Sequence, residues 1–179
     1  MKIAKVIPNN RRHGFEVFTR GKQYLFPYAA VKPSPTRSNR VVAAQVDAEL
    51  GGEGFVYQLA SGEEGVVHID HVLEYNRDPE YMTDQLLYNL TLCAQTAVKN
   101  SELSVRELIR RLGTSPAQFY RLLDQTNYRK SMRQLLALLH LLRYDIDVVL
   151  RTQKMAVGRA SSGVQTEVRI TSDSGQVQS

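Results

Sequence analysis

Apolar and polar residues alternate through the front part of the chain, which is the pattern of strands that are buried on one face. Gly21-Lys22 and the segment Ser61-Gly-Glu-Glu-Gly65 predict tight turns between neighbouring strands. A loop broken by two prolines separates the hairpins at residues 31–39. We expect five or six short strands, at residues 2–8, 14–20, 23–28, 40–50, 54–60 and 66–70. With glycine turns and no helix between them, they predict a small antiparallel sheet or partial barrel.

The hydrophobic period lengthens near Asp78, from two residues to three or four. Asp78 suits an N-cap, and Pro79 suits the first helical position because an amide there would have no partner within the helix. The apolar residues that then recur at three- and four-residue spacing are Met82, Leu86, Leu90, Cys93 and Ala97. This spacing predicts an amphipathic helix that ends near Asn100.

Three short segments after this helix begin with the same signature. Ser104, Ser115 and Ser131 are each followed three residues later by Glu or Gln. In such a capping box the serine hydroxyl accepts from the third helical amide, and the Glu or Gln side chain accepts from the serine amide. We therefore expect three consecutive helices. The last contains the leucine-rich run at 135–142 and should lie at the centre of a bundle.

The end of the chain changes character again. Residues 144–151 alternate and predict a terminal strand, whereas residues 152–179 are rich in Ser, Thr, Gln and Gly, which predicts a disordered, flexible tail. Together the patterns predict an α+β fold. We expect a β-rich module over 1–77, a helical bundle with a helix-turn-helix over 78–151, and a tail over 152–179. The β-rich module is expected to bind a partner or ligand, or to dimerise.

A turn at Gly113 separates two apolar helix faces. Leu108 and Leu112 share a face before it, and Phe119 and Leu122 share a face after it. The two faces meet across the turn if glycine adopts the left-handed conformation that ends the first helix. This spacing predicts a helix-turn-helix at about residues 103–124.

Residues 103–123 resemble the helix-turn-helix of the lambda-repressor-like, or Xre-type, family, and the resemblance covers about residues 81–151. One departure is Ile109, because the family usually has alanine where the two helices approach closely. In this family the second helix of the pair lies in the major groove of DNA. By position, the resemblance implies DNA contacts by Ser115, Ala117, Gln118, Tyr120 and Arg121. Gln118 would suit adenine, and Arg121 would suit guanine or a phosphate.

The resemblance also implies contacts outside the second helix. Backbone clamps that set register are expected from Thr126, Asn127, Tyr128, Arg129 and Lys130. Arg106, Arg110 and Arg133 are expected to flank the groove. Two structural alternatives stay open at this point: Gln118 could be committed to capping Ser115, and Tyr120 could pack against the long helix.

The placement of charge changes the picture more than its total, which is a formal net charge of +5. Residues 1–80 carry equal numbers of basic and acidic side chains. Residues 103–133 carry seven basic side chains against two acidic ones, a local surplus of five. Positive charge concentrated in this way is typical of a polyphosphate partner. A solvated helix face would give the same pattern, and charge alone does not separate the two.

Other candidate chemistry is sparse. Cys93 is the one cysteine, so a disulfide framework is excluded and a reducing compartment is expected. Without an apolar leader or a spanning apolar run, we expect a soluble, cytoplasmic protein and no membrane partner. His68-Ile-Asp-His71 offers three metal ligands without a fourth, so we expect no metal. We also expect no cofactor and no enzymatic activity, because no nucleophile–base pair or phosphate-binding glycine loop is evident.

These observations favour a sequence-specific, double-stranded-DNA-binding transcriptional regulator, a repressor that binds as a homodimer. The resemblance further implies an antitoxin-type autoregulator, whose protein partner would be a toxin bound through the β-rich module or the tail. The alternative is a protein-interaction adaptor whose helix-turn-helix no longer binds DNA.

Overall fold

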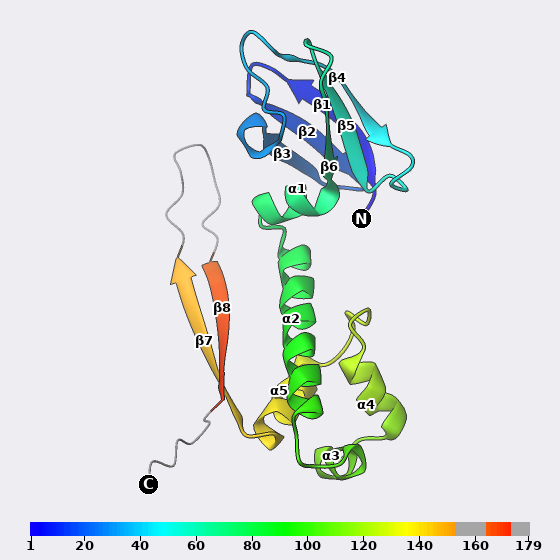
Figure 1. Ribbon diagram of the computed structural model, residues 1–179, viewed down its shortest axis with the longest axis vertical. Helices are drawn as coiled ribbons and strands as arrows, with labels where there is room; N and C mark the ends of the chain where they lie inside the picture. The colour runs from blue at the N-terminus through cyan, green and yellow to red at the C-terminus, as the bar shows by residue number, and fades with distance from the viewer. Residues whose placement is uncertain (153–163, 173–179) are drawn as a thin grey trace. The chain divides into compact units, whose positions relative to one another are not determined.

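The alternating segments of the front half form six strands in two antiparallel sheets (Figure 1). The first sheet contains β1 (Ile3–Asn9), β2 (Gly14–Thr19) and β3 (Gln23–Pro27), and the second contains β4 (Val41–Asp47), β5 (Gly54–Leu59) and β6 (Glu64–His68). A 3₁₀ turn, η1 (Tyr28–Ala30), follows β3. The computed structural model describes residues 1–152 and 164–172. Its mixed α+β architecture confirms the predicted fold class.

An aromatic cluster holds the two sheets together. Phe15 of β2 is fully buried, and its ring centroid lies 4.8 Å from that of Tyr28, 5.0 Å from that of Phe55 and 5.1 Å from that of Tyr57. Because Phe55 and Tyr57 belong to β5, these contacts join one sheet to the other. Inward-facing aromatics therefore form the core of this unit, as the alternating pattern predicts.

Gly65 of β6 is directly opposite Tyr57 of β5 in the strand register. The buried Tyr57 ring occupies the space where a Cβ at position 65 would lie, so any larger residue there would overlap the ring. The Tyr57 hydroxyl, at the end of this ring, donates a 2.6 Å hydrogen bond to the Pro33 carbonyl. Glycine at 65 is thus required by close approach rather than by its backbone conformation.

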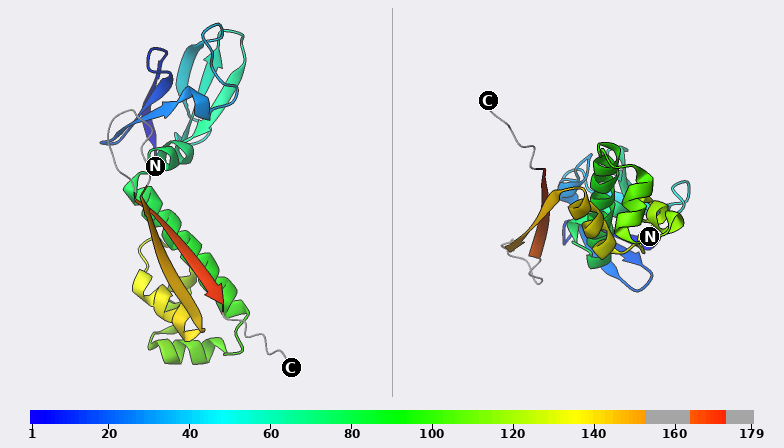
Figure 2. Two further views of the ribbon diagram at one scale, coloured as in Figure 1. Left: turned by 90° about the vertical axis from the view of Figure 1, so that its left-hand side faces the viewer. Right: turned by 90° about the horizontal axis from the view of Figure 1, so that it is seen from below.

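A short helix follows β6, where the sequence predicted a strand that continues to Asp70. α1 (Ile69–Tyr75) begins after His68, whose Nδ1 accepts from the Asp70 amide. Ile69, Val72 and Leu73 are buried, and α1 contacts β3 and β6 (Figure 2). The strand therefore ends at His68, two residues before its predicted end, and His68 caps the helix. Burial of this apolar triplet against the sheet edges favours the helix over a longer strand.

The chain divides into two compact units, Met1–Met82 and Thr83–Ser179, where the sequence predicted a boundary between 77 and 78. The division falls within α2 (Pro79–Lys99). Asp78 caps this helix as predicted: its Oδ1 accepts from the Tyr81 amide at 3.2 Å. Its Oδ2 accepts from Lys22 Nζ at 2.7 Å and from the Tyr24 hydroxyl at 2.8 Å. The first turn of α2 is thereby fixed to β3 and the turn before it.

The second unit is a helical bundle. Besides α2 it contains α3 (Val105–Leu112), α4 (Pro116–Leu123) and α5 (Met132–Leu141), which follow one another in the lower part of Figure 1. Its core is a separate cluster whose fully buried members include Ala94, Leu108, Phe119, Leu135, Leu138 and Leu139. Three of these leucines belong to α5, which confirms that the leucine-rich helix packs at the centre.

All three predicted serine caps are present, but one is more complete than the others. The hydroxyls of Ser104, Ser115 and Ser131 each accept from the amide three residues later, at 3.2–3.4 Å. Only at Ser115 does the structure show the reciprocal bond, in which the serine amide donates to the side chain of Gln118. The α4 N-terminus therefore has the capping box that the sequence predicts.

After α5 the chain forms an antiparallel pair of strands, β7 (Tyr144–Thr152) and β8 (Val164–Ser172). β7 confirms the predicted terminal strand, and it contacts α5. β8 differs from the flexible tail predicted over 152–179, because Val164–Ser172 pairs with β7 along its whole length. The rest of the predicted tail, 153–163 and 173–179, lies outside the described residues.

Candidate nucleic-acid interface

α3 and α4 are joined by a tight turn at residues 113–115. Gly113 adopts the left-handed conformation, with φ 66° and ψ 37°, and its amide donates to the Arg110 carbonyl at 3.2 Å. The Thr114 amide donates to the Ile109 carbonyl, also at 3.2 Å, which completes the cap of α3. Ile109 is half-buried at the edge of the helical core. The turn thus ends α3 as the sequence predicts and redirects the chain into α4.

α4 has one buried and one exposed face. Phe119 and Leu122 point into the core. The exposed side chains are those for which the sequence predicted DNA contacts, namely Ser115, Ala117, Gln118, Tyr120 and Arg121. Tyr120 is 62% exposed and touches only the edge of Phe119 among the described rings, so it does not pack against the long helix. The whole polar side of α4 is therefore open to a partner.

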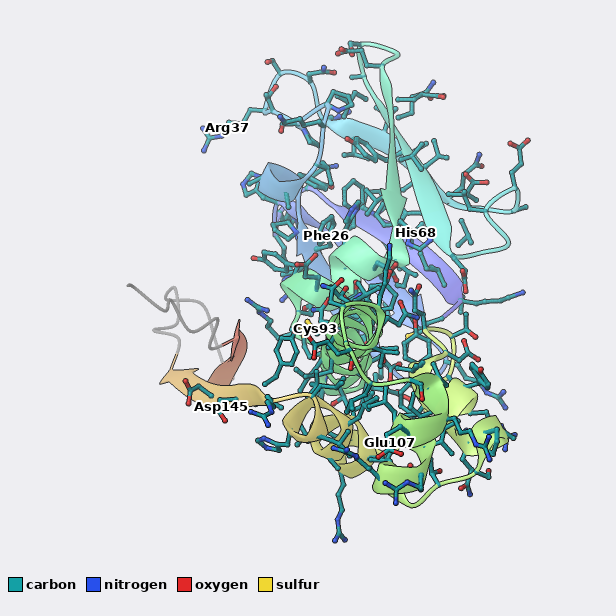
Figure 3. The ribbon with its side chains drawn as sticks, turned by 60° about the horizontal axis from the view of Figure 1, so that its bottom comes forward. Phe26, Arg37, His68, Cys93, Glu107 and Asp145 are labelled. Atoms are coloured by element: carbon teal, nitrogen blue, oxygen red, sulfur yellow. The ribbon has the colours of Figure 1, made fainter. Side chains whose placement is uncertain are left out.

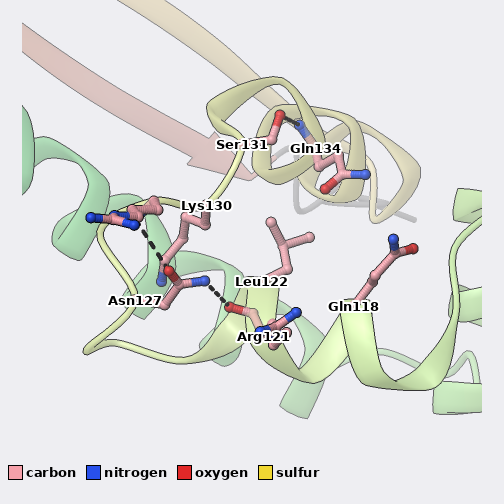
Figure 4. A pocket seen from close by; sticks show the side chains of 8 residues that line it. Gln118, Arg121, Leu122, Asn127, Lys130, Ser131 and Gln134 are labelled. Atoms are coloured by element: carbon pink, nitrogen blue, oxygen red, sulfur yellow. Dashed lines mark hydrogen bonds between the residues drawn. The ribbon is translucent and has the colours of Figure 1, made fainter.

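A surface cavity of about 230 Å³ lies beside this face (Figure 4). It is bounded by α4, the loop after it and the start of α5, and its polar lining residues are Gln118, Arg121, Asn127, Arg129, Lys130, Ser131 and Gln134. Leu122 forms its floor. Gln134 was not among the predicted site residues, although its position in the Ser131 capping box places it at the helix start. The cavity presents amide and guanidinium donors together.

Gln118 has only part of its side chain available. Its Oε1 accepts from the Thr114 hydroxyl at 3.0 Å and from the Ser115 amide at 3.4 Å. The capping role left open by the sequence is therefore occupied in this structure. The Nε2 group has no protein partner within the described residues, so the exposed end of Gln118 acts as a hydrogen-bond donor.

Asn127 organises the loop between α4 and α5. Its Nδ2 donates to the Arg121 carbonyl at 3.1 Å, and its Oδ1 accepts from the Arg129 amide at 3.1 Å. Asp124 contributes a second turn, because its Oδ1 accepts from the amide and the hydroxyl of Thr126. These hydrogen bonds lower the pKa of Asp124 from its ordinary value. Asn127, predicted as a backbone clamp, thus binds the protein's own chain on both sides.

Lys130 points inward rather than outward. Its Nζ donates to the Thr91 hydroxyl of α2 at 2.8 Å and also to the Asp124 carbonyl. Burial lowers the pKa of Lys130, and the Asp124 carboxylate opposes this effect. Tyr128, by contrast, is 47% exposed on the outer side of the same loop. Tyr128 and Lys130 therefore differ in what they offer a partner.

Apart from Lys130, the basic residues of 103–133 fall into two groups. Glu107 pairs with Arg110, with a closest contact of 2.6 Å, and with Arg111, also at 2.6 Å. These hydrogen bonds lower the pKa of Glu107 to about 2. Figure 3 shows Glu107 among basic side chains at this end of the bundle. Within residues 103–133, the exposed arginines without a carboxylate within ion-pair distance among the described residues are Arg106, Arg121, Arg129 and Arg133.

Other site types find no support in the described part of the chain. Across residues 1–152 and 164–172, no group of three or more His, Cys, Asp and Glu side chains could hold a metal ion. No helix within the same ranges is long and apolar enough to cross a membrane. No family model matches the chain, and neither a curated protein nor a solved structure shows significant similarity to it.

Proposed function

We propose that this protein is a sequence-specific transcriptional regulator that binds double-stranded DNA with α4 in the major groove. The observation that carries the proposal is the exposed polar face of α4 next to Arg121 and Arg129, which have no carboxylate within ion-pair distance in the described part of the chain. Unpaired guanidinium groups beside an exposed helix face offer what a duplex needs, namely phosphate neutralisation and base-edge donors. A paired cluster such as Arg110, Arg111 and Glu107 would offer much less.

The geometry divides the roles among the residues. Since Oε1 of Gln118 is used by the cap, its Nε2 would donate one hydrogen bond to a purine N7 or another acceptor, instead of binding adenine bidentately. Arg121 would bind guanine or a phosphate. Arg129 and Tyr128 would contact phosphates from the loop, and Arg106 would contact them from the start of α3.

The regulator would act as a homodimeric repressor. Helix-turn-helix proteins of this kind bind two half-sites that lie about one turn of the DNA helix apart, which requires two copies of the recognition helix. Autoregulation, with a toxin as the second protein partner, is the form of repression that the sequence resemblance favours. Analytical ultracentrifugation with and without duplex DNA measures the number of copies, and a 2:1 protein–duplex complex is expected.

The decisive experiment is selection of bound duplexes from a random pool, followed by affinity measurements across salt concentrations. The selected duplex should bind at least about a thousandfold more tightly than a scrambled one. Its affinity should fall steeply as salt rises, because each neutralised phosphate releases counterions. Equal affinity for both duplexes would contradict sequence reading, and absence of binding at low salt would contradict DNA binding altogether.

One observation favours a second candidate, the protein-interaction adaptor. Tyr120 and Tyr128 are both largely exposed, and tyrosine with arginine is the composition of interface hot spots. An adaptor would bind a protein through this face and would leave every duplex unbound at low salt. Loss of both tyrosines would then abolish the protein complex.

A further inference from the structure

The loop at residues 124–130 presents Tyr128 and Arg129, and its own contacts show how it is held. Two residues of α2, Thr91 and Gln95, stand one helical turn apart and reach the two ends of this loop. At the start, Gln95 Nε2 donates to the Leu123 carbonyl at 2.7 Å. Gln95 Oε1 also accepts from Gln125 Nε2 at 2.9 Å. At the far end, Thr91 accepts from Lys130.

The Thr91 hydroxyl is arranged to receive an ammonium. The residue is 0% exposed, and its hydroxyl proton is used in a 2.6 Å hydrogen bond to the Leu87 carbonyl. The Thr91 oxygen can therefore only accept a further hydrogen bond, and Lys130 Nζ lies 2.8 Å from it as the donor. The second acceptor of Lys130, the Asp124 carbonyl, is the residue at which the loop begins. One ammonium thus joins both ends of the loop to the helix behind it.

From these contacts we infer that Lys130 is a positioning residue, which holds Arg129 and Tyr128 toward DNA through Thr91 and does not itself neutralise a phosphate. The inference rests on the proposed DNA binding. It revises the sequence expectation, which placed Lys130 among the backbone clamps. Asn127 extends the effect to α4, since it links the Arg121 carbonyl to the Arg129 amide.

Salt dependence separates positioning from direct contact. A side chain that neutralises a phosphate contributes close to one unit to the slope of log K against log salt concentration, and its removal lowers the slope by about one. A side chain that only positions others changes the affinity and leaves the slope unchanged. Arg129, which precedes Lys130 in the chain, supplies the comparison for a direct contact.

The test measures the affinity of the full chain for its selected duplex of about 30 base pairs, long enough for two half-sites one turn apart. The variants are Lys130→Met, Thr91→Val and Arg129→Met. Thr96→Val, a substitution of an exposed threonine on the same helix, is the matched control. Lys130→Met and Thr91→Val should each weaken binding roughly three- to tenfold without changing the slope. Arg129→Met should lower the slope by about one. Thr96→Val should have no effect.

Coupling between the two positions completes the test. The double variant Lys130→Met with Thr91→Val should bind no more weakly than Lys130→Met alone, because both changes remove the same contact. Thr91→Ser keeps the hydroxyl and should restore binding, which distinguishes loss of the contact from misfolding. Circular dichroism of each variant reports whether the helices remain folded.

Two results would overturn the inference while leaving DNA binding intact. In the first, Lys130→Met lowers the salt slope by about one and Thr91→Val binds as the unaltered protein does, which identifies Lys130 as a phosphate ligand. In the second, both variants bind normally. Absence of duplex binding by the unaltered protein would instead overturn the proposed function, and the inference with it.

Discussion

The two units of this protein differ in the balance of their charged side chains. In the first unit, Asp78 is 3% exposed and accepts hydrogen bonds from Lys22 and Tyr24, and the charges of residues 1–80 are equal in number. In the second, Arg121 and Arg129 stand exposed beside a cavity with no carboxylate within ion-pair distance among the described residues. The first unit also has exposed arginines, such as Arg37 and Arg40, but its basic and acidic side chains are equal in number, whereas residues 103–133 carry a surplus of five basic side chains. The two units therefore differ in local net charge, and the surplus surrounds α4.

The largest expected effects test whether each unit depends on its own core. Phe15→Ala should destabilise the first unit and Phe119→Ala the second, each by about 3–5 kcal/mol, since both rings are fully buried. Hydrogen exchange followed by mass spectrometry reads the peptides of each unit separately. Loss of protection should stay within the unit that carries the substitution. Equal loss in both units after either change would show that the two clusters do not act separately.

The next effect sharpens the contrast in charge. Arg121→Ala with Arg129→Ala should weaken DNA binding roughly a hundredfold, at about tenfold for each lost contact, and lower the salt slope by about one for each lost phosphate contact. Arg37→Ala with Arg40→Ala removes two exposed arginines from the first unit and provides the matched control. Fluorescence anisotropy across salt concentrations measures both. A similar loss from the control pair would mean that the charge of the first unit also serves DNA.

A smaller effect concerns the pH dependence of the first unit. Burial opposes ionisation of Asp78, but the hydrogen bonds from Lys22, Tyr24 and the Tyr81 amide outweigh it and lower the pKa of Asp78 below its ordinary value of 3.8. A carboxyl whose folded pKa lies below its unfolded pKa stabilises the fold above the unfolded value. That stabilisation is lost as the pH falls through the folded value.

Asp78→Asn should therefore lower the free energy of unfolding by about 2 kcal/mol at neutral pH, because a charge-assisted hydrogen bond is replaced while the N-cap is kept. The difference between variant and unaltered protein should shrink below about pH 4, where the unfolded carboxyl protonates. Urea denaturation at a series of pH values measures this difference. A difference that stays constant down to the lowest pH would argue against the charged state of Asp78 as its source.

The smallest effect converts a paired cluster into an unpaired one. Glu107→Gln removes the counter-charge of Arg110 and Arg111 and frees both guanidinium groups. Binding to a scrambled duplex should strengthen about two- to fivefold at low salt, and the gain should disappear at high salt. Glu102→Gln, at an exposed acid just before α3, controls for the change in net charge alone. If Glu107→Gln and Glu102→Gln strengthened binding equally, the change in net charge would be responsible, and not the release of Arg110 and Arg111.

Much of the fold could be predicted because its signals are local. The strands alternate, and each of the three serine caps is set by residues three positions apart. α1 was missed because its apolar triplet spans too few residues to establish a helical period, and histidine is an uncommon cap. β8 was missed because its sequence is largely polar, and its partner strand lies earlier in the chain.

Only part of the candidate site could be predicted, because only contacts between residues close in the sequence leave a local pattern. The exposed face of α4 follows from the positions of Phe119 and Leu122, and the pairing of Glu107 with Arg110 and Arg111 follows from helical spacing. The inward turn of Lys130 depends on Thr91, which lies 39 residues earlier in the sequence. A contact between residues so far apart depends on the tertiary fold, and neither the charge of Lys130 nor the spacing of residues around it predicts that contact.

The glycine opposite Tyr57 has a consequence for how the β5–β6 hairpin forms. Gly65 is flanked by Glu64 and Val66, so a pairing shifted by one residue in either direction would bring a bulky side chain against the ring. A one-residue slip would also exchange the two faces of β6, which would turn the buried Val67 outward and the exposed Val66 inward. Steric overlap with the ring and loss of this buried valine therefore both oppose the slip. The absence of a side chain at position 65 therefore restricts the β5–β6 hairpin to the one alignment of its strands in which glycine is opposite the tyrosine ring.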